Sequence, residues 1–114
     1  MADCLFCRIV SGDVPADVIA SNDDAVAFRD ISPVAPTHVL VIPRVHQPNL
    51  AAVAEAAPDA LVAMVRLARE IAAEDGVEDV GYRLVANTGA AAHQTVFHAH
   101  LHVLGGRTMG WPPG

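Results

Sequence analysis

The chain has 114 residues, of which 53% are hydrophobic, and this is enough for one domain with a buried core. Its 7 basic and 13 acidic residues give a formal net charge of −6, which argues against a broad nucleic-acid-binding surface. No apolar run approaches the ~18 residues of a membrane span, and the first residues lack the basic region of a secretory signal. We therefore expect a cytoplasmic protein that forms one domain over residues 1–114 and ends in a tail over residues 105–114.

The first part of the chain predicts one short helix followed by strands. The apolar run over residues 5–10 favours one or two helical turns, which Gly12 and Pro15 end. A later run of β-branched residues and leucine predicts a buried strand that ends at Pro43. Three strands are expected in this part, at residues 17–20, 25–29 and 38–42.

One long helix is predicted in the middle of the chain. Pro58 suits a first helical position and Gly76 suits the end of a helix. Two more strands are expected at residues 82–86 and 97–104, joined by a loop over residues 87–95. Strands on both sides of one main helix favour an α+β fold with an antiparallel sheet. The helix has an apolar stripe that we interpret as core: Leu61, Met64, Val65, Ala68, Ile71 and Ala72.

Histidine recurs at every second position of the last predicted strand, at His98, His100 and His102. Because successive side chains of a strand point to opposite faces, these three imidazoles would share one face. Near neutral pH an imidazole can act as a nucleophile, as a general acid or base, or as a metal ligand. The row therefore predicts a reaction centre, and a polar strand face or an accidental metal-binding stripe is the alternative.

The chain contains two cysteines, Cys4 and Cys7, in a C-x-x-C spacing. They are too close together to link distant parts of a fold by a disulfide bond. Taken alone, this pair is compatible with a zinc site, with a redox pair or with neither.

Several sequence blocks together resemble the histidine triad family of nucleotide hydrolases and transferases, in its Hint-like branch. Residues 98–104 match the family pattern of His-x-His-x-His followed by apolar residues. The resemblance implies the HIT-like α+β fold, with an antiparallel sheet of about five strands, one long helix and one short helix. It also implies a homodimer across which the sheet continues. The other matching blocks are Asp30-Ile31-Ser32-Pro33, Pro36-Thr37-His38, Val41-Ile42-Pro43, Gly105-Gly106-Arg107 and the tail Trp111-Pro112-Pro113-Gly114.

The resemblance implies cleavage of purine nucleoside phosphoramidates or adenylated compounds through a covalent intermediate. His100 would attack the α-phosphorus, and water would then release AMP or GMP. His98 and His102 would contact phosphate oxygens or protonate the leaving group, and His38 would lie near the nucleophile unless it is a buried structural residue. Neither an organic cofactor nor a catalytic metal is implied. The alternatives are cleavage of diadenosine polyphosphates and a non-enzymatic nucleotide-binding module.

Further positions match substrate-binding residues of the family. Asp30 would hold the ribose hydroxyls, because a carboxylate accepts two hydrogen bonds side by side. Thr95, preceded by Gln94, would contact the phosphate, and Asn87 would be a polar site residue unless it serves only the turn. Trp111 would reach the site of the partner subunit. A group of residues that could equally be core would line the base pocket: Phe6, Ile9, Val14, Phe28 and Ile31.

Two further features concern the loop beside the phosphate and the cysteine pair. His93 stands where Hint-like members usually have glycine. The loss of glycine narrows the backbone conformations available beside the phosphate. Contact of the phosphate with the backbone of this loop is therefore left open, and contact with the His93 side chain is the alternative. Some bacterial members complete a structural zinc site around the cysteine pair with two histidines, which would be His46 and His98. A zinc ion on one ring nitrogen would make His98 an orienting residue.

Overall fold

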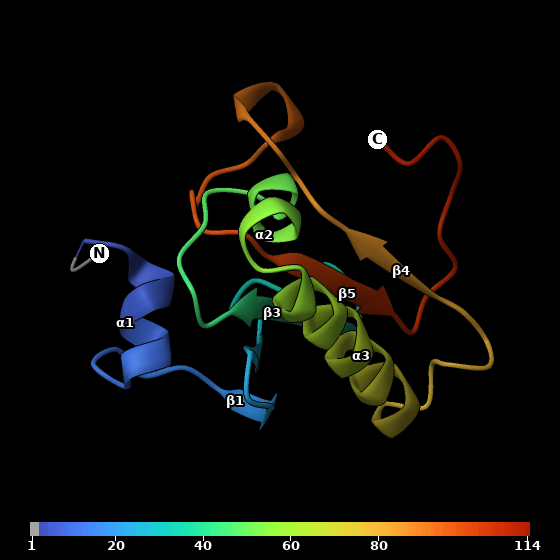
Figure 1. Cartoon of the computed structure of the whole chain (residues 1–114). Coiled ribbons are helices and arrows are strands. Elements are labelled where there is room, and N and C mark those ends of the chain that lie inside the picture. Colours follow the sequence, from blue (N-terminus) through green and yellow to red (C-terminus); the bar gives the residue numbers. More distant parts are fainter. Residues whose placement is uncertain (1–2) are drawn as a thin grey trace.

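The computed structural model describes residues 3–114 and contains a five-stranded antiparallel sheet with helices on both faces (Figure 1). The strand order is β1-β2-β3-β5-β4, so β1 and β4 form the two edges. These findings confirm the predicted α+β class and the five-stranded antiparallel sheet. The strands are β1 (Val18–Ser21), β2 (Ala25–Arg29), β3 (Thr37–Pro43), β4 (Tyr82–Val85) and β5 (Leu101–Gly105).

The long helix α3 (Pro58–Glu74) crosses one face of the sheet, where it contacts β1, β2, β3 and β5. As predicted, Pro58 stands at its first turn; Gly76 follows the C-cap residue Asp75 and adopts a φ of +75°. One residue of the predicted stripe is wrong, because Val65 lies at the margin of the buried face and is 45% exposed. The main core lies between this helix and the sheet, and its largest fully buried members are Met64, Leu67, Val39, Val41, Val53 and Val103.

The short helix α1 (Leu5–Ser11) covers the opposite face of the sheet. The Sγ of Cys4 caps its N-terminus by accepting from the backbone N–H of Cys7 at 3.4 Å, and Gly12 ends it with a φ of +85°. The helix buries two side chains against alternate residues of β2 and β3. This second cluster consists of Phe6, Ile9, Val26, Phe28, Leu40 and Ile42.

A second short helix, α2 (Leu50–Ala56), was not predicted. It packs against α3, and the side chain of Asn49 caps it by accepting from the backbone N–H of Ala52 at 2.9 Å. Only Val53 within it is buried, so the segment has no apolar stripe that would indicate a helix.

The last strand begins later than predicted, at Leu101 and not at residue 97. Its pairing with β3 stops at Val41 and Leu101, since Pro43 has no N–H to donate and the N–H of Ala99 bonds instead to the carbonyl of Gln47 at 2.7 Å. The strand extends to Gly105, so the irregular tail starts one residue later than expected. The bounds of β2 are as predicted, and those of β1, β3 and β4 differ from the predicted bounds by one residue at one or both ends. No helix in the described part of the chain is long and apolar enough to cross a membrane.

Gly105 lies where β5 meets the turn that follows α3. A Cβ at this position would approach the Val77 Cγ2 to 2.9 Å and the Val77 Cβ to 3.0 Å. Replacement of Gly105 by alanine should therefore destabilise the protein by about 1–3 kcal/mol, as measured by urea denaturation. Gly110→Ala is the matched control, because a Cβ there would meet nothing within 4 Å. Equal midpoints for the two variants would contradict this close packing.

Candidate active site

Three imidazoles gather on the face of the sheet that α1 covers. His38 comes from β3 and His102 from β5, and their Nε2 and Nδ1 atoms are 2.9 Å apart. The ring of His100 lies 5.1 Å from that of His102, and Phe6 of α1 meets the His100 ring edge-on at 5.2 Å. His98 and His100 precede β5, so strand alternation alone does not account for the arrangement, contrary to our expectation.

The ring of His98 is fully buried and has partners at both nitrogens. Its Nε2 lies 2.9 Å from the carbonyl oxygen of Pro43, so this nitrogen carries the proton and donates. Its Nδ1 therefore holds the lone pair, which faces the Sγ atoms of Cys4 at 3.4 Å and Cys7 at 3.6 Å. Because both nitrogens are engaged, this geometry favours an orienting role for His98 over direct contact with a phosphate.

The protonation of His38 follows from a backbone contact. The N–H of Val34 donates to the Nδ1 of His38 at 3.1 Å, so the proton of a neutral His38 is on Nε2. That N–H donates to the Nδ1 of His102, and the Oδ2 of Asp30 lies farther away, at 3.4 Å. A neutral His102 consequently carries its own proton on Nε2.

His100 has the opposite arrangement. Its Nδ1 lies 2.7 Å from the carbonyl oxygen of His98 and donates to it, which leaves the lone pair on Nε2. Of the four imidazoles in this part of the described chain, those of His38, His98, His100 and His102, only that of His100 has a lone pair not already committed to a protein group. An imidazole held in this tautomer can attack an electrophilic phosphorus.

Burial controls the charge of the site. It lowers the pKa of His102 to about 4, with a further lowering by His100 and His38 that Asp30 partly opposes. Burial also lowers the pKa of His98, against the hydrogen bond to Pro43. His102 is therefore neutral at pH 7, and its Nε2–H is a neutral hydrogen-bond donor.

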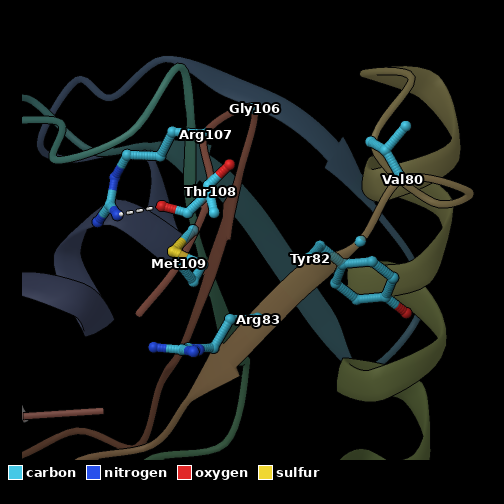
Figure 2. Close-up of a pocket in the computed structure, with 8 residues that line it drawn as sticks. Val80, Tyr82, Arg83, Gly106, Arg107, Thr108 and Met109 are labelled. Carbon is cyan, nitrogen blue, oxygen red and sulfur yellow. Dashed lines mark hydrogen bonds between the residues drawn. The ribbon is translucent and has the colours of Figure 1, made fainter. Parts of the chain in front are cut away.

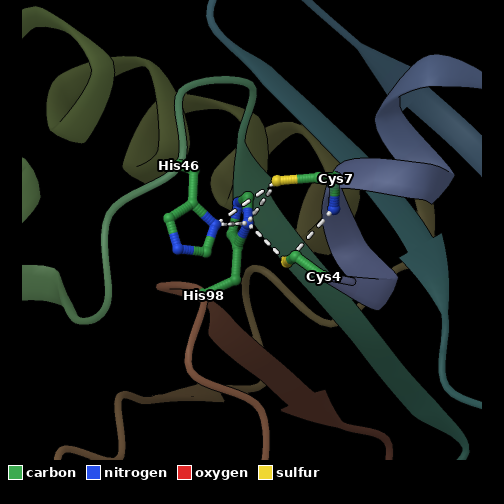
Figure 3. Close-up of side chains that lie close together, drawn as sticks. All are labelled: Cys4, Cys7, His46 and His98. Carbon is green, nitrogen blue, oxygen red and sulfur yellow. Dashed lines mark hydrogen bonds between the residues drawn. The ribbon is translucent and has the colours of Figure 1, made fainter. Parts of the chain in front are cut away.

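Four side chains from three segments form the Cys/His cluster of Cys4, Cys7, His46 and His98 (Figure 3). Their candidate ligand atoms all lie within 4.8 Å of one another; the Nδ1 of His46 is 3.3 Å from the Cys7 Sγ and 3.2 Å from the His98 Nδ1. Both thiols are free, and burial raises the pKa of Cys7, as does its contact with Cys4. Two sulfurs and two imidazoles form a donor set for tetrahedral zinc, and the Pro43 carbonyl orients one imidazole as an outer partner would.

Asp30, His38 and His102 also offer three ligand atoms within 4.8 Å of one another. Their hydrogen bonds do not suit a metal ion. A neutral imidazole bound through Nε2 carries its proton on Nδ1, but the Nδ1 of His38 faces the N–H of Val34 and must accept from it. The two clusters therefore differ in chemistry, and only the Cys/His cluster fits a cation.

A cavity of about 250 Å³ lies between α1 and the ends of β2 and β3. All five apolar residues predicted for the base pocket line it, together with Asp30. Ile31 is 99% exposed and forms its rim. Six lining residues were not predicted: Leu5, Pro15, Ala16, Asp17, Arg29 and Leu40. Leu40 could have been predicted, because it follows His38 by two positions on a strand and so shares its face.

The loop between β4 and β5 contains the three predicted polar residues. Gln94 is buried and braces the loop, with its Oε1 accepting from the N–H of Gly89 at 2.9 Å and its Nε2 donating to the carbonyls of Pro48 and Val96. These bonds leave its amide little capacity to bind a ligand. Thr95 is exposed and Asn87 is half-buried.

His93 adopts a φ of 66° and a ψ of 34°, and it is the only non-glycine residue with a positive φ in the described chain. The loop thus keeps a conformation that glycine would adopt, despite the Cβ atom, at a cost of about 1–2 kcal/mol. The His93 side chain is exposed.

A larger cavity, of about 550 Å³, lies beside the edge strand β4 and the start of the tail (Figure 2). Its two guanidinium groups already have partners: Arg83 donates to the carbonyl of Gly110 at 2.9 Å, and Arg107 donates to that of Val34 at 2.9 Å. The histidine row does not line it. Trp111 follows in the tail and is 83% exposed.

Comparisons with known proteins agree with this geometry. The family model described as "HIT domain" matches residues 11–109. The chain is 41% identical to the purine nucleoside phosphoramidase of Escherichia coli K12 over 108 residues, which covers 95% of this chain and 91% of that protein. It is 42% identical to the 14 kDa zinc-binding protein of Zea mays over 112 residues, covering 96% and 87% of the two chains. The crystal structure of a HIT family hydrolase from Legionella pneumophila superimposes with a TM-score of 0.93 at 44% identity and covers 98% of this chain and 100% of that one. The chain belongs to the HIT, or histidine triad, family.

Proposed function

We propose that this protein is a nucleotide hydrolase that cleaves purine nucleoside phosphoramidates or related adenylated compounds and releases AMP or GMP. The observation that carries the proposal is the hydrogen bond from the His100 Nδ1 to the His98 carbonyl, which leaves the Nε2 lone pair available for attack. The identity to a purine nucleoside phosphoramidase supports the substrate class.

The reaction would have two steps. The Nε2 of His100 attacks the α-phosphorus, and the bond from phosphorus to the leaving nitrogen breaks as that nitrogen takes a proton from water. A water molecule then attacks the same phosphorus and gives its proton to the hydroxide left by the first step, the bond from phosphorus to Nε2 breaks, and the nucleoside monophosphate leaves with His100 restored. His102 would donate from its neutral Nε2–H to a phosphoryl oxygen in both steps.

The 250 Å³ cavity supports a nucleoside subsite beside this centre. The purine would contact its apolar walls, to which Phe6 and Phe28 contribute. Asp30 would accept from the ribose hydroxyls, since only its Oδ1 is used by a backbone contact, from the N–H of Ser32 at 2.8 Å. Thr95 and Asn87 would contact the phosphate side of the substrate.

The Cys/His cluster would hold a structural zinc ion. A bound zinc ion would cross-link the start of α1 to the segment that follows β3 and to the segment that precedes β5, because its four ligands come from these three parts of the chain. The donor set and the outer contact from Pro43 support this assignment, as does the identity to a zinc-binding protein. The reaction as proposed requires neither a catalytic metal nor an organic cofactor.

A homodimer would complete the site. The edge strand β4 has an unpaired side on which a second copy could continue the sheet, and the neighbouring Val80 and Leu84 are exposed (Figure 1). Trp111 would reach the active site of the partner subunit, because its tail runs along this side and away from α1. Free thiols in a metal cluster suit a reducing compartment, which supports our placing the protein in the cytoplasm.

The first test is release of AMP from adenosine 5′-phosphoramidate. Turnover should be lost by about 10³-fold or more in His100→Ala, because the attacking atom is removed, and Arg66→Ala, at an exposed position of α3, should retain it as a control. Mass spectrometry of quenched wild-type enzyme should detect AMP joined to His100. AMP binding without turnover would favour a nucleotide-binding module, and preferred cleavage of diadenosine tetraphosphate would favour the polyphosphate hydrolase.

The second test measures zinc in the purified protein. Elemental analysis should find about one zinc ion per chain in the wild type and much less in Cys7→Ser, because one of four ligands is lost. The variant should also melt at a lower temperature. Arg8→Ala, on the same helix but outside the cluster, should keep its zinc; a metal-free wild type, still metal-free after incubation with zinc, would refute the site.

The third test concerns the buried His102. Its folded pKa of about 4 lies below the ~6.5 of an unfolded histidine, so the unfolded state binds more protons between these values. The stability that His102 contributes is present above pH 6.5 and is lost as the pH falls toward 4. The urea midpoint should therefore fall between pH 7.5 and pH 5 by less in His102→Asn than in the wild type. Parallel curves would show that His102 titrates normally.

A further inference from the structure

Asp75 connects the helix α3 to the ends of two strands. Its Oδ2 and Oδ1 accept from the Nη1 and Nη2 of Arg29 at 2.8 and 2.9 Å, and the Oδ2 also accepts from the hydroxyl of Thr37 at 2.8 Å. The Asp75 side chain is 16% exposed and Thr37 is buried. Two parallel hydrogen bonds between a guanidinium and a carboxylate define the relative position of both groups closely.

Each partner of Asp75 directly adjoins a residue of the proposed site. Arg29 precedes Asp30, and Thr37 precedes His38. Because neighbouring side chains alternate across a sheet, Arg29 and Thr37 face α3 whereas Asp30 and His38 face the site. The contacts of Asp75 thus lie directly behind the site, on the other face of the sheet.

The chain is irregular between these two strand ends. Pairing of β2 with β3 ends at Arg29 and Val39, and one further bond, from the N–H of Asp30 to the carbonyl of His38 at 3.0 Å, closes the loop. These backbone bonds align Asp30 with His38, but they do not by themselves fix the Asp30 carboxylate relative to the His38 ring. The bridge through Asp75 is the contact that ties both strand ends to a rigid helix.

Helix stability does not account for an acidic residue at this place. Asp75 is the C-cap of α3, where the helix dipole disfavours a negative charge, and Glu74 precedes it. Its pKa is nevertheless lowered, chiefly by the hydrogen bond from Arg29 and also by that from Thr37. The carboxylate is thus stabilised by the strand ends and not by its own helix.

We propose that Asp75 is a positioning residue that sets the geometry of Asp30 and His38 from behind the sheet, through Arg29 and Thr37. The inference deepens the proposed function, on which it rests. Arg29 also lines the nucleoside cavity next to Asp17 and Asp30. Loss of Asp75 would leave the Arg29 guanidinium without its partner behind the sheet and would free the strand end that carries Asp30 to move.

The test compares AMP affinity, measured by titration calorimetry, with melting temperature. Asp75→Asn should weaken AMP binding about tenfold, because the bidentate pair is lost and the Asp30 carboxylate moves. Thr37→Val should weaken it less, while Thr37→Ser, which keeps the hydroxyl, should bind as the wild type does. Glu78→Gln is the matched control: it removes one charge from an exposed ion pair with Arg69 at 3.2 Å and should leave the affinity within about twofold.

A second readout is independent of the proposed activity. In nuclear magnetic resonance spectra of the free protein, the Nε2–H of His38, bonded to His102, should give an imidazole signal that Asp75→Asn shifts or broadens and Glu78→Gln does not. If Asp75→Asn lowers the melting temperature but changes neither the AMP affinity nor this signal, Asp75 is purely structural and the inference fails. If the wild type neither binds nor releases AMP, the proposed function fails, and the His38 signal still decides the role of Asp75.

Discussion

The hydrogen bond from the His98 ring to the Pro43 carbonyl is the contact on which the rest of the site depends. It uses the carbonyl of a residue that has no N–H, at the point where β3 can no longer pair with β5. It also turns the His98 Nδ1 toward the cysteines of α1. The backbone of His98 is then placed so that its carbonyl accepts from the His100 ring. One bond thus bears on the end of a strand, on the orientation of the proposed metal ligand and on the tautomer of the proposed nucleophile.

The two faces of the sheet have different tasks. On one face, α3 buries aliphatic side chains and anchors the strand ends through Asp75. On the other face, α1 supplies little core but contributes Cys4, Cys7 and Phe6, all of which contact the histidines. Rigid packing behind the sheet is what allows polar groups in front of it to keep defined partners. The arrangement explains how a small core can support the proposed reactive centre.

Most of the secondary structure could be predicted from residue types and spacing. Apolar and β-branched runs indicated all five strands, and Pro58 and Gly76 indicated the bounds of α3, because these signals act locally. The helix α2 was not predicted because its alanine-rich segment has no apolar stripe. The start of β5 was predicted too early because Pro43, on the neighbouring strand β3, ends the pairing of the two strands. The residues of the cavity and of the Cys/His cluster were predicted from the resemblance to the histidine triad family, because they lie far apart in the sequence. The tautomers, the bracing role of Gln94 and the bridge at Asp75 depend on contacts between distant residues, which no spacing encodes.

The charges around the site bear on the substrate. The chain has no lysine and a net charge of −6, the guanidinium of Arg29 is bound to Asp75, and that of Arg107 is bound to carbonyls. Burial keeps His102 neutral, so the imidazole beside His100 offers an uncharged N–H group. Uncharged donors can hold one phosphoryl group but neutralise little of the charge on a polyphosphate chain. These charges agree with the substrate that we propose, a nucleotide with a single phosphorus and a nitrogen leaving group.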